Sequence, residues 1–240
     1  MAVHGKGTKI LMDGWDMGNV LNSVETPLTA DTAETTVFNS SGTKTYVVGV
    51  QDATLSAEGF FVSSSSDGSV ESTLAGALSS SDLNVWTWWP NGTSTGNAGF
   101  GVTAIETGYT ITSPVDGTVD ISIEGQVSDG RDRLRSLRIL SCGVTSTGNG
   151  AGVDGVSAST QGGIGYFQRV TNSTNDFKVI IQDSNNNSTF DNLISFTSGT
   201  GRTGERIAVA GEVKRYVREV HTTTGALGTA INFSAGFSRK

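Results

Sequence analysis

The sequence is short of cysteine, proline and charged side chains, and each shortage excludes something. Its 240 residues contain one cysteine, Cys142, so no intramolecular disulfide can form and nothing indicates an oxidising compartment. The chain has strand-length apolar runs throughout, which argues against disorder. It has only three prolines and no long helix-forming runs, which argues against a helical protein. No run approaches 18 apolar residues, so we expect no membrane-spanning helix. The first seven residues lack the apolar stretch of a secretory signal peptide, and we expect none.

Charge is scarce and mostly negative. Charged residues are 16% of the chain, against about 25% in an average protein, and the formal net charge is −7. An acidic chain is poorly suited to tight nucleic-acid binding, which needs clustered Lys and Arg. The single basic cluster, Arg131 to Arg138, is interrupted by Asp132, and we interpret it as a solvated or interfacial strand edge rather than a DNA site. An acidic wall could still let DNA pass without sticking.

The residues that are plentiful predict a mainly β protein. Glycine occurs 32 times and short apolar stretches alternate with Ser, Thr and Asn. Val119, Ile121 and Ile123 alternate with polar residues, which predicts a strand with one buried and one wet face. A single helix is predicted after residue 69, where Leu74 and Leu78 fall on one face. In 83–89 we expect Trp86 and Trp88 to share a core face, with Trp89 at an exposed end.

Four segments together resemble a known family. They are Thr8–Asp16, Lys44–Asp52, Ala53–Phe61 and Ser113–Gly130, with "DGWD", "YVVGVQD", "ATLSAEGFF" and "SPVDGTVDISIEGQVSDG" as their cores. Their order resembles the major tail tube proteins of long-tailed bacteriophages, over roughly residues 1–130. The resemblance implies a tail-tube-like β-sandwich or barrel with one flanking helix, followed by a second β-sandwich domain.

We expect three regions along the chain. Residues 1–142 would form the tail-tube-like domain with an N-terminal arm, 143–163 a Gly-rich linker or surface loop, and 164–240 a second β domain. A faint repeat of the Thr-Gly and Tyr spacing suggests that the second domain repeats the tube domain. A galactose-binding-like jelly roll is the other reading. A doubled subunit would form a trimeric ring with pseudo-six-fold symmetry, and an undoubled one a hexamer.

The resemblance also implies where the functional surfaces lie. Polar faces of two strands would line a lumen, and exposed arms would carry assembly contacts. The lumen-facing candidates are Thr54, Ser56, Glu58, Asp120, Ser122 and Glu124. The assembly candidates are His4, Lys6, Lys9, Phe38, Lys44, Tyr46, Phe237 and Arg239, with the loop 39–46 as a stacking contact.

Signals for catalysis or metal binding are weak. Asp183, Asn185 and Asn187 are spaced like a calcium loop, but the glycine and the bidentate glutamate of such a loop are missing. A literal G-x-G-x-x-G at 199–204 lies between strands, with no helix to follow it. His4, His221 and Cys142 are too scattered to suggest zinc. We expect no enzyme activity and no cofactor.

The resemblance therefore predicts a structural virion protein. Copies would form stacked rings that make up the phage tail tube, the conduit for DNA delivery, and would be assembled in the host cytoplasm. The implied partners are further copies, the tape measure, tail terminator and baseplate proteins, and viral DNA passing through without specific binding. The alternative is a virion decoration or fibre-like protein that binds glycan through Trp89 and the polar hairpin at 183–191.

Overall fold

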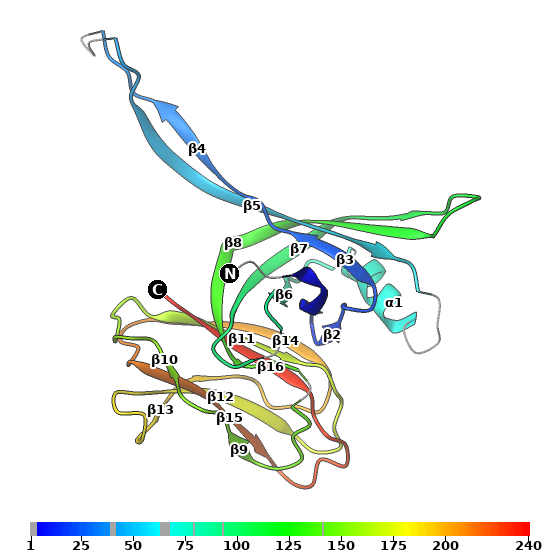
Figure 1. The fold of residues 1–240 in the computed structure, drawn as a ribbon, viewed down its shortest axis with the longest axis vertical. Helices are drawn as coiled ribbons and strands as arrows, with labels where there is room; N and C mark the ends of the chain where they lie inside the picture. Colours follow the sequence, from blue (N-terminus) through cyan, green and yellow to red (C-terminus); the bar gives the residue numbers. More distant parts are fainter. Residues whose placement is uncertain (1–3, 39–41, 63–67, 79, 93, 141) are drawn as a thin grey trace.

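The computed structural model describes residues 4–38, 42–62, 68–78, 80–92, 94–140 and 142–240. Within them lie one α-helix, one short 3₁₀-helix and sixteen strands, so the chain is mainly β, as the sequence predicts (Figure 1). The elements in chain order are η1 (Gly5–Gly7), β1 (Lys9–Met12), β2 (Trp15–Asp16), β3 (Leu21–Glu25), β4 (Leu28–Glu34), β5 (Tyr46–Phe60), α1 (Gly68–Ala77), β6 (Asn84–Trp89), β7 (Ala98–Thr112), β8 (Asp120–Arg138), β9 (Gly148–Asn149), β10 (Val153–Asp154), β11 (Gly163–Arg169), β12 (Phe177–Ser184), β13 (Asp191–Ser195), β14 (Thr203–Val209), β15 (Tyr216–Thr223) and β16 (Phe233–Arg239). None of the helices described is long and apolar enough to cross a membrane.

The first half of the chain is built on four antiparallel strands in the order β3-β5-β8-β7. Their side chains alternate between an apolar face and a polar face. The apolar face includes Leu55, Ala57 and Ile123, which belong to one core together with Leu74 of helix α1 and Trp86 of β6. The predicted helix is thus confirmed, and it covers the apolar face of this sheet.

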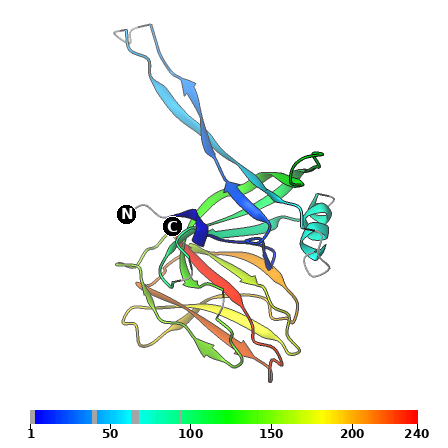
Figure 2. The same cartoon turned by 45° about the vertical axis from the view of Figure 1, so that its right-hand side comes forward.

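A long two-stranded arm projects from this sheet (Figures 1 and 2). It consists of β4 and the first half of β5, which pair antiparallel from Leu28–Ala53 to Glu34–Tyr46, with a shift of register between Ala30 and Thr32. Every residue of β4 and every residue of β5 up to Asp52 is exposed. Because neither face of the arm is covered, its strands do not contribute to the core.

Strand β8 joins the two halves of the molecule. Asp129 and Gly130 both adopt a left-handed backbone conformation, with φ of 63° and 77°, and β8 bends between its two ends (Figure 1). Beyond the bend β8 pairs with β16, so one sheet of eleven strands runs through both halves. The second half packs β11, β14 and β16 of this sheet over a smaller sheet of β10, β15, β12 and β13, with β9 on β15.

The Gly-rich segment 143–163 lies against the second sandwich. Its strands β9 and β10 both pair with β15, and Val144 and Ser159 form single bridges to Ile231 and Val213. The apolar side chains between the sheets form a separate core that includes Phe167, Phe177 and Phe233.

The position of Trp89 corrects a sequence-based expectation. Trp89 is 0% exposed and packs with Leu134 and Tyr166 in a third core between the two halves. Its ring touches the backbone positions of Gly99 and Gly236, where an added Cβ would lie 2.1 Å and 2.5 Å from ring atoms. The expected exposed end is wrong because β6 is buried on both faces, and Trp89 is not available to stack on a sugar.

Candidate assembly surfaces

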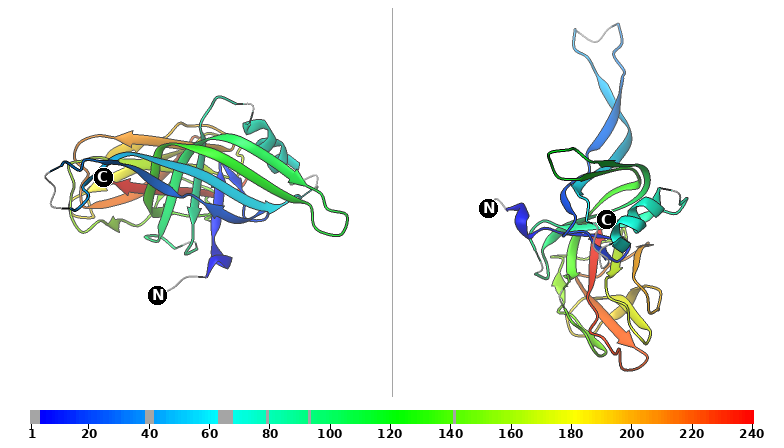
Figure 3. Two further views of the ribbon diagram at one scale, coloured as in Figure 1. Left: turned by 90° about the horizontal axis from the view of Figure 1, so that it is seen from above. Right: turned by 90° about the vertical axis from the view of Figure 1, so that its right-hand side faces the viewer.

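The six lumen candidates lie on one face of the four-stranded sheet. Ser56 is directly opposite Glu124, and Glu58 is directly opposite Ser122. Thr54 and Asp120 continue the same face, since both lie an even number of residues from these pairs. The same face also includes Ser23 and Glu25 on the neighbouring strand β3, and Thr110 and Thr112 on the neighbouring strand β7. The structure therefore brings together residues that are about 65 positions apart in the sequence (Figure 3).

This polar face is acidic. Glu25, Glu58, Asp120 and Glu124 are all exposed on it. The strand segments that form it, residues 21–25, 53–60, 104–112 and 120–126, contain no Lys or Arg. Polyanions are repelled by such a surface, because no cation is available to replace their counterions.

The arm carries three of the assembly candidates. Phe38, just beyond β4, is fully exposed, and Tyr46 is more than half exposed. Lys44 Nζ lies 3.0 Å from the Glu34 carboxylate and forms an exposed ion pair between the two sides of the arm. Val47, Val48 and Val50 add further exposed apolar surface. Residues 39–41 of the expected stacking loop lie outside the described residues. Exposed apolar side chains on a paired ribbon are typical of a surface that a partner covers.

The N-terminal candidates are divided between an arm and the sheet. His4 Nδ1 accepts a hydrogen bond of 3.1 Å from the Lys6 backbone N–H, which caps the 3₁₀-turn η1. Lys9 is already in strand β1, opposite Trp89 of β6. Only His4 and Lys6 therefore extend beyond the sheet.

The two C-terminal candidates are engaged within the fold. Phe237 is 4% exposed in the core of the second sandwich, so its ring cannot reach a neighbouring molecule. Arg239 donates hydrogen bonds to the backbone carbonyls of Val213 and Lys214, at 2.6 Å and 2.7 Å. The structure corrects the role expected for Phe237, because alternation along β16 turns it inward.

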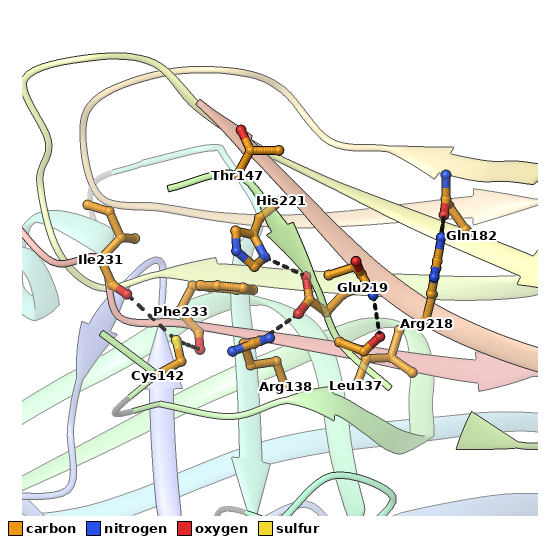
Figure 4. A network of polar contacts seen from close by, with 12 residues as sticks. Leu137, Arg138, Cys142, Thr147, Gln182, Arg218, Glu219, His221, Ile231 and Phe233 are labelled. Carbon is orange, nitrogen blue, oxygen red and sulfur yellow. Dashed lines mark hydrogen bonds and ion pairs between the residues drawn. The ribbon is translucent and has the colours of Figure 1, made fainter. Parts of the chain in front are cut away.

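One buried cluster of charged side chains has residue types that could serve in an active site. Glu219 accepts from Arg138 Nε at 2.5 Å and lies 3.0 Å from His221 Nδ1 (Figure 4). Cys142 Sγ is directed instead toward the carbonyls of Ile231 and Phe233, and burial raises the pKa of this thiol. The thiol has no hydrogen bond to the imidazole that could activate it. Among the described residues no group of three or more His, Cys, Asp or Glu converges on a metal position. The cluster is an ion pair between the two sheets.

Sequence reasoning missed the length of the arm. It assigned 39–46 to a loop and placed no strand at β4. The available signal was the run Leu28–Glu34, in which Thr and Ala alternate without a consistent apolar face. Such a pattern is typical of a strand that has no core to face.

Comparisons with known proteins give similarities of fold at low identity. No family model matches the chain, and no curated protein matches its sequence. A solved chain from the tail of an empty gene transfer agent particle is 15% identical over 54% of this chain and 97% of its own, with a TM-score of 0.43. The SPP1 tail tube protein is 13% identical over 55% of this chain and 78% of its own, at 0.39. The SPP1 Dit protein, described as a paradigm of the hub of an adsorption apparatus, is 12% identical over 97% of this chain and 98% of its own, at 0.38. These are all components of phage-type tails.

Proposed function

We propose that this chain is a structural protein of a phage tail whose copies assemble into rings that surround the path of DNA. The observation that carries the proposal is the acidic polar face of the β3-β5-β8-β7 sheet, with Glu58 and Glu124 among its carboxylates. Helix α1 and the second sandwich lie on the other side of this sheet, so the polar face remains open (Figure 1). An open polar sheet face becomes an inner wall when copies are arranged around an axis.

Two open strand edges support closure of a ring. Among the described residues, strand β3 pairs with β5 alone, and residues 105–112 of β7 pair with β8 alone. Unpaired edges are aggregation-prone unless another strand covers them. If β3 of one copy approaches β7 of the next, the contact is head-to-tail and a ring leaves no edge exposed. The projecting arm would then extend to a neighbouring copy or ring.

Stacked rings would form the tail tube, with the tape measure, tail terminator and baseplate proteins as further partners. A hub made of a single ring is the related possibility, and it would use the same inner face. A glycan-binding decoration protein is disfavoured, because the Trp89 ring expected to carry sugar stacking is buried.

Electron microscopy of the purified protein at increasing concentration tests the proposal. We expect rings, or tubes of stacked rings, with a lumen wide enough for a DNA duplex. Tubes would support the tube role, and single rings that do not stack would support a hub. Subunit counts would distinguish a trimer of doubled subunits from a hexamer. Monomers at all concentrations, also in the presence of other tail proteins, would contradict the proposal.

A further inference from the structure

A pocket with arginines on its rim opens at one end of the second sandwich. Its volume is about 440 Å³, within the range of about 300–1,000 Å³ found for ligand pockets. Leu137, Val217 and Phe237 contribute apolar lining. Arg133 and Arg135, two positions apart on β8, lie on the same side of that strand and are exposed. We call this site the arginine pocket.

Contacts within the chain only partly satisfy the two arginines of the arginine pocket. Arg133 makes no hydrogen bond or ion pair in the part of the chain that the structure describes, and Arg135 donates only to the Gly96 carbonyl, at 3.1 Å. Asp154 on the rim is already paired with Arg215, at 2.7 and 2.8 Å. Arg135 contributes to holding the pKa of Asp154 low, but neither Arg133 nor Arg135 forms an ion pair with a described residue. They favour an occupant that combines a carboxylate with an apolar group.

The turn between β7 and β8 presents that combination. Residues 113–118 are all exposed, and we call them the β7–β8 tip. Val115 at its end is fully exposed, and Asp116 beside it makes no hydrogen bond or ion pair with any described residue. Pro114 fixes the backbone on one side of the tip. An apolar side chain next to an unpaired carboxylate, held on a stiff hairpin, complements the arginine pocket in shape and charge.

The tip and the pocket lie at opposite ends of the molecule. In the views from the front and from above, the β7–β8 tip points one way, while β10 and the C-terminus, which border the pocket, lie at the other end (Figures 1 and 3). A molecule cannot fill its own pocket with its own tip. Two complementary features at opposite ends are what a repeating head-to-tail contact requires.

We infer that the β7–β8 tip of one copy docks in the arginine pocket of the next copy. Val115 enters the mouth of the pocket, which the exposed Ala98 helps to line, and the Asp116 carboxylate pairs with Arg133 and Arg135 on the rim. This inference rests on the proposed self-assembly and specifies one contact within it.

Disulfide trapping tests the contact directly. In a Cys142→Ala background, Ala98→Cys, which lies in the pocket lining, is combined with Val115→Cys. Oxidation should give a ladder of covalent multimers, because the two sulfurs meet only between copies. The matched control combines Val115→Cys with Ala226→Cys, an exposed position on a distant loop, and should stay monomeric on a denaturing gel. Equal ladders, or no ladder from assembled protein, would overturn the inference.

Charge exchange gives a second, reversible test. Asp116→Arg and Arg133→Glu should each raise the concentration needed for assembly by about tenfold, and the double variant should restore most of the loss. Asp82→Arg, a change of the same kind at another exposed acid, should leave assembly unchanged. If wild-type protein assembles and neither test responds, the docking is wrong while the proposed function stands. If wild-type protein never assembles, both fail.

Discussion

The Gly14 backbone N–H donates a hydrogen bond of 2.7 Å to the side-chain oxygen of Gln168, across 154 positions of the chain. The Gln168 amide in turn donates to the Val85 carbonyl at 2.7 Å, and Asp13 Oδ1 accepts from the Val85 N–H at 2.9 Å. Gln168 is fully buried. The turn between β1 and β2 thus inserts between the halves of the molecule, and the two halves should unfold together.

Replacing Gln168 by Leu should weaken this joint. The change leaves the Gly14 N–H without its partner in a buried place, which costs about 1 to 3 kcal/mol, while the Val85 carbonyl keeps the hydrogen bond of 3.1 Å from the Asp13 N–H. Urea unfolding followed by tryptophan fluorescence would measure the loss. Gln161→Leu, at an exposed position, should change the free energy of unfolding by less than about 0.5 kcal/mol. Equal losses for both variants would show that Gln168 has no special role.

Gly14 should not tolerate even alanine. Its φ is 81°, and an added Cβ would lie 2.3 Å from the Arg169 carbonyl oxygen. Gly211 has a similar φ of 90° with nothing within 4 Å, so Gly211→Ala carries only the backbone cost, about 1 kcal/mol. Gly14→Ala should lose clearly more stability in thermal unfolding, because the turn must also move away from β11. A loss no greater than that of Gly211→Ala would contradict the close contact.

The pH dependence of stability should depend on Glu106. Glu106 is 6% exposed, its buried carboxylate oxygens have no hydrogen-bond partner among described residues, and burial raises its pKa to about 7. Between about pH 4.3, its value in an unfolded chain, and pH 7, the folded state binds more protons than the unfolded state. The free energy of unfolding should therefore fall as the pH rises through this window.

Glu106→Gln should remove that fall and make the protein more stable at pH 8, with little effect at pH 4. Glu25→Gln, at an exposed position, is the control and should not alter the profile. Burial also raises the pKa of Asp13 to about 6, although the Val85 N–H opposes this, so a smaller fall below pH 6 should persist in Glu106→Gln. Chemical unfolding at several pH values would measure both steps. An unchanged profile would mean that the Glu106 carboxylate is hydrated in the folded protein.

Local patterns in the sequence were sufficient to predict the mainly β fold, the helix and the alternation of Ile121 and Ile123 with polar neighbours. They could not predict which strands meet, since the pairing of Glu58 with Ser122 depends on contacts between distant segments. They failed at Trp89 for the same reason, because a second layer of the same sheet covers it. The arginine pocket also could not be predicted from local patterns, since its lining comes from β7, β8, β10, β15 and β16.

The buried ion pair between Arg138 and Glu219 should be costly to break from one side. Arg138→Met leaves the fully buried Glu219 carboxylate with only His221 beside it, and a loss of about 3 to 5 kcal/mol is expected. The double variant Arg138→Met with Glu219→Leu should recover much of that loss, because no buried charge then remains. Lys44→Met breaks the exposed pair with Glu34 and should cost less than about 1 kcal/mol. A double variant less stable than Arg138→Met would contradict this account.

Reversing the charge of the polar face should create a surface that binds DNA. Glu58→Lys combined with Glu124→Lys places two cations on neighbouring strands of a face that otherwise lacks them. Assemblies of this variant should retain duplex DNA in a gel-shift assay at low salt, and release it as salt is raised, because the attraction comes from counterion release. Asp31→Lys with Glu34→Lys makes the same change in charge on the arm. If the polar face surrounds the DNA path, only the first pair should hold DNA inside the assemblies, protected from nuclease. Equal protection by both variants would mean that the polar face does not line the lumen.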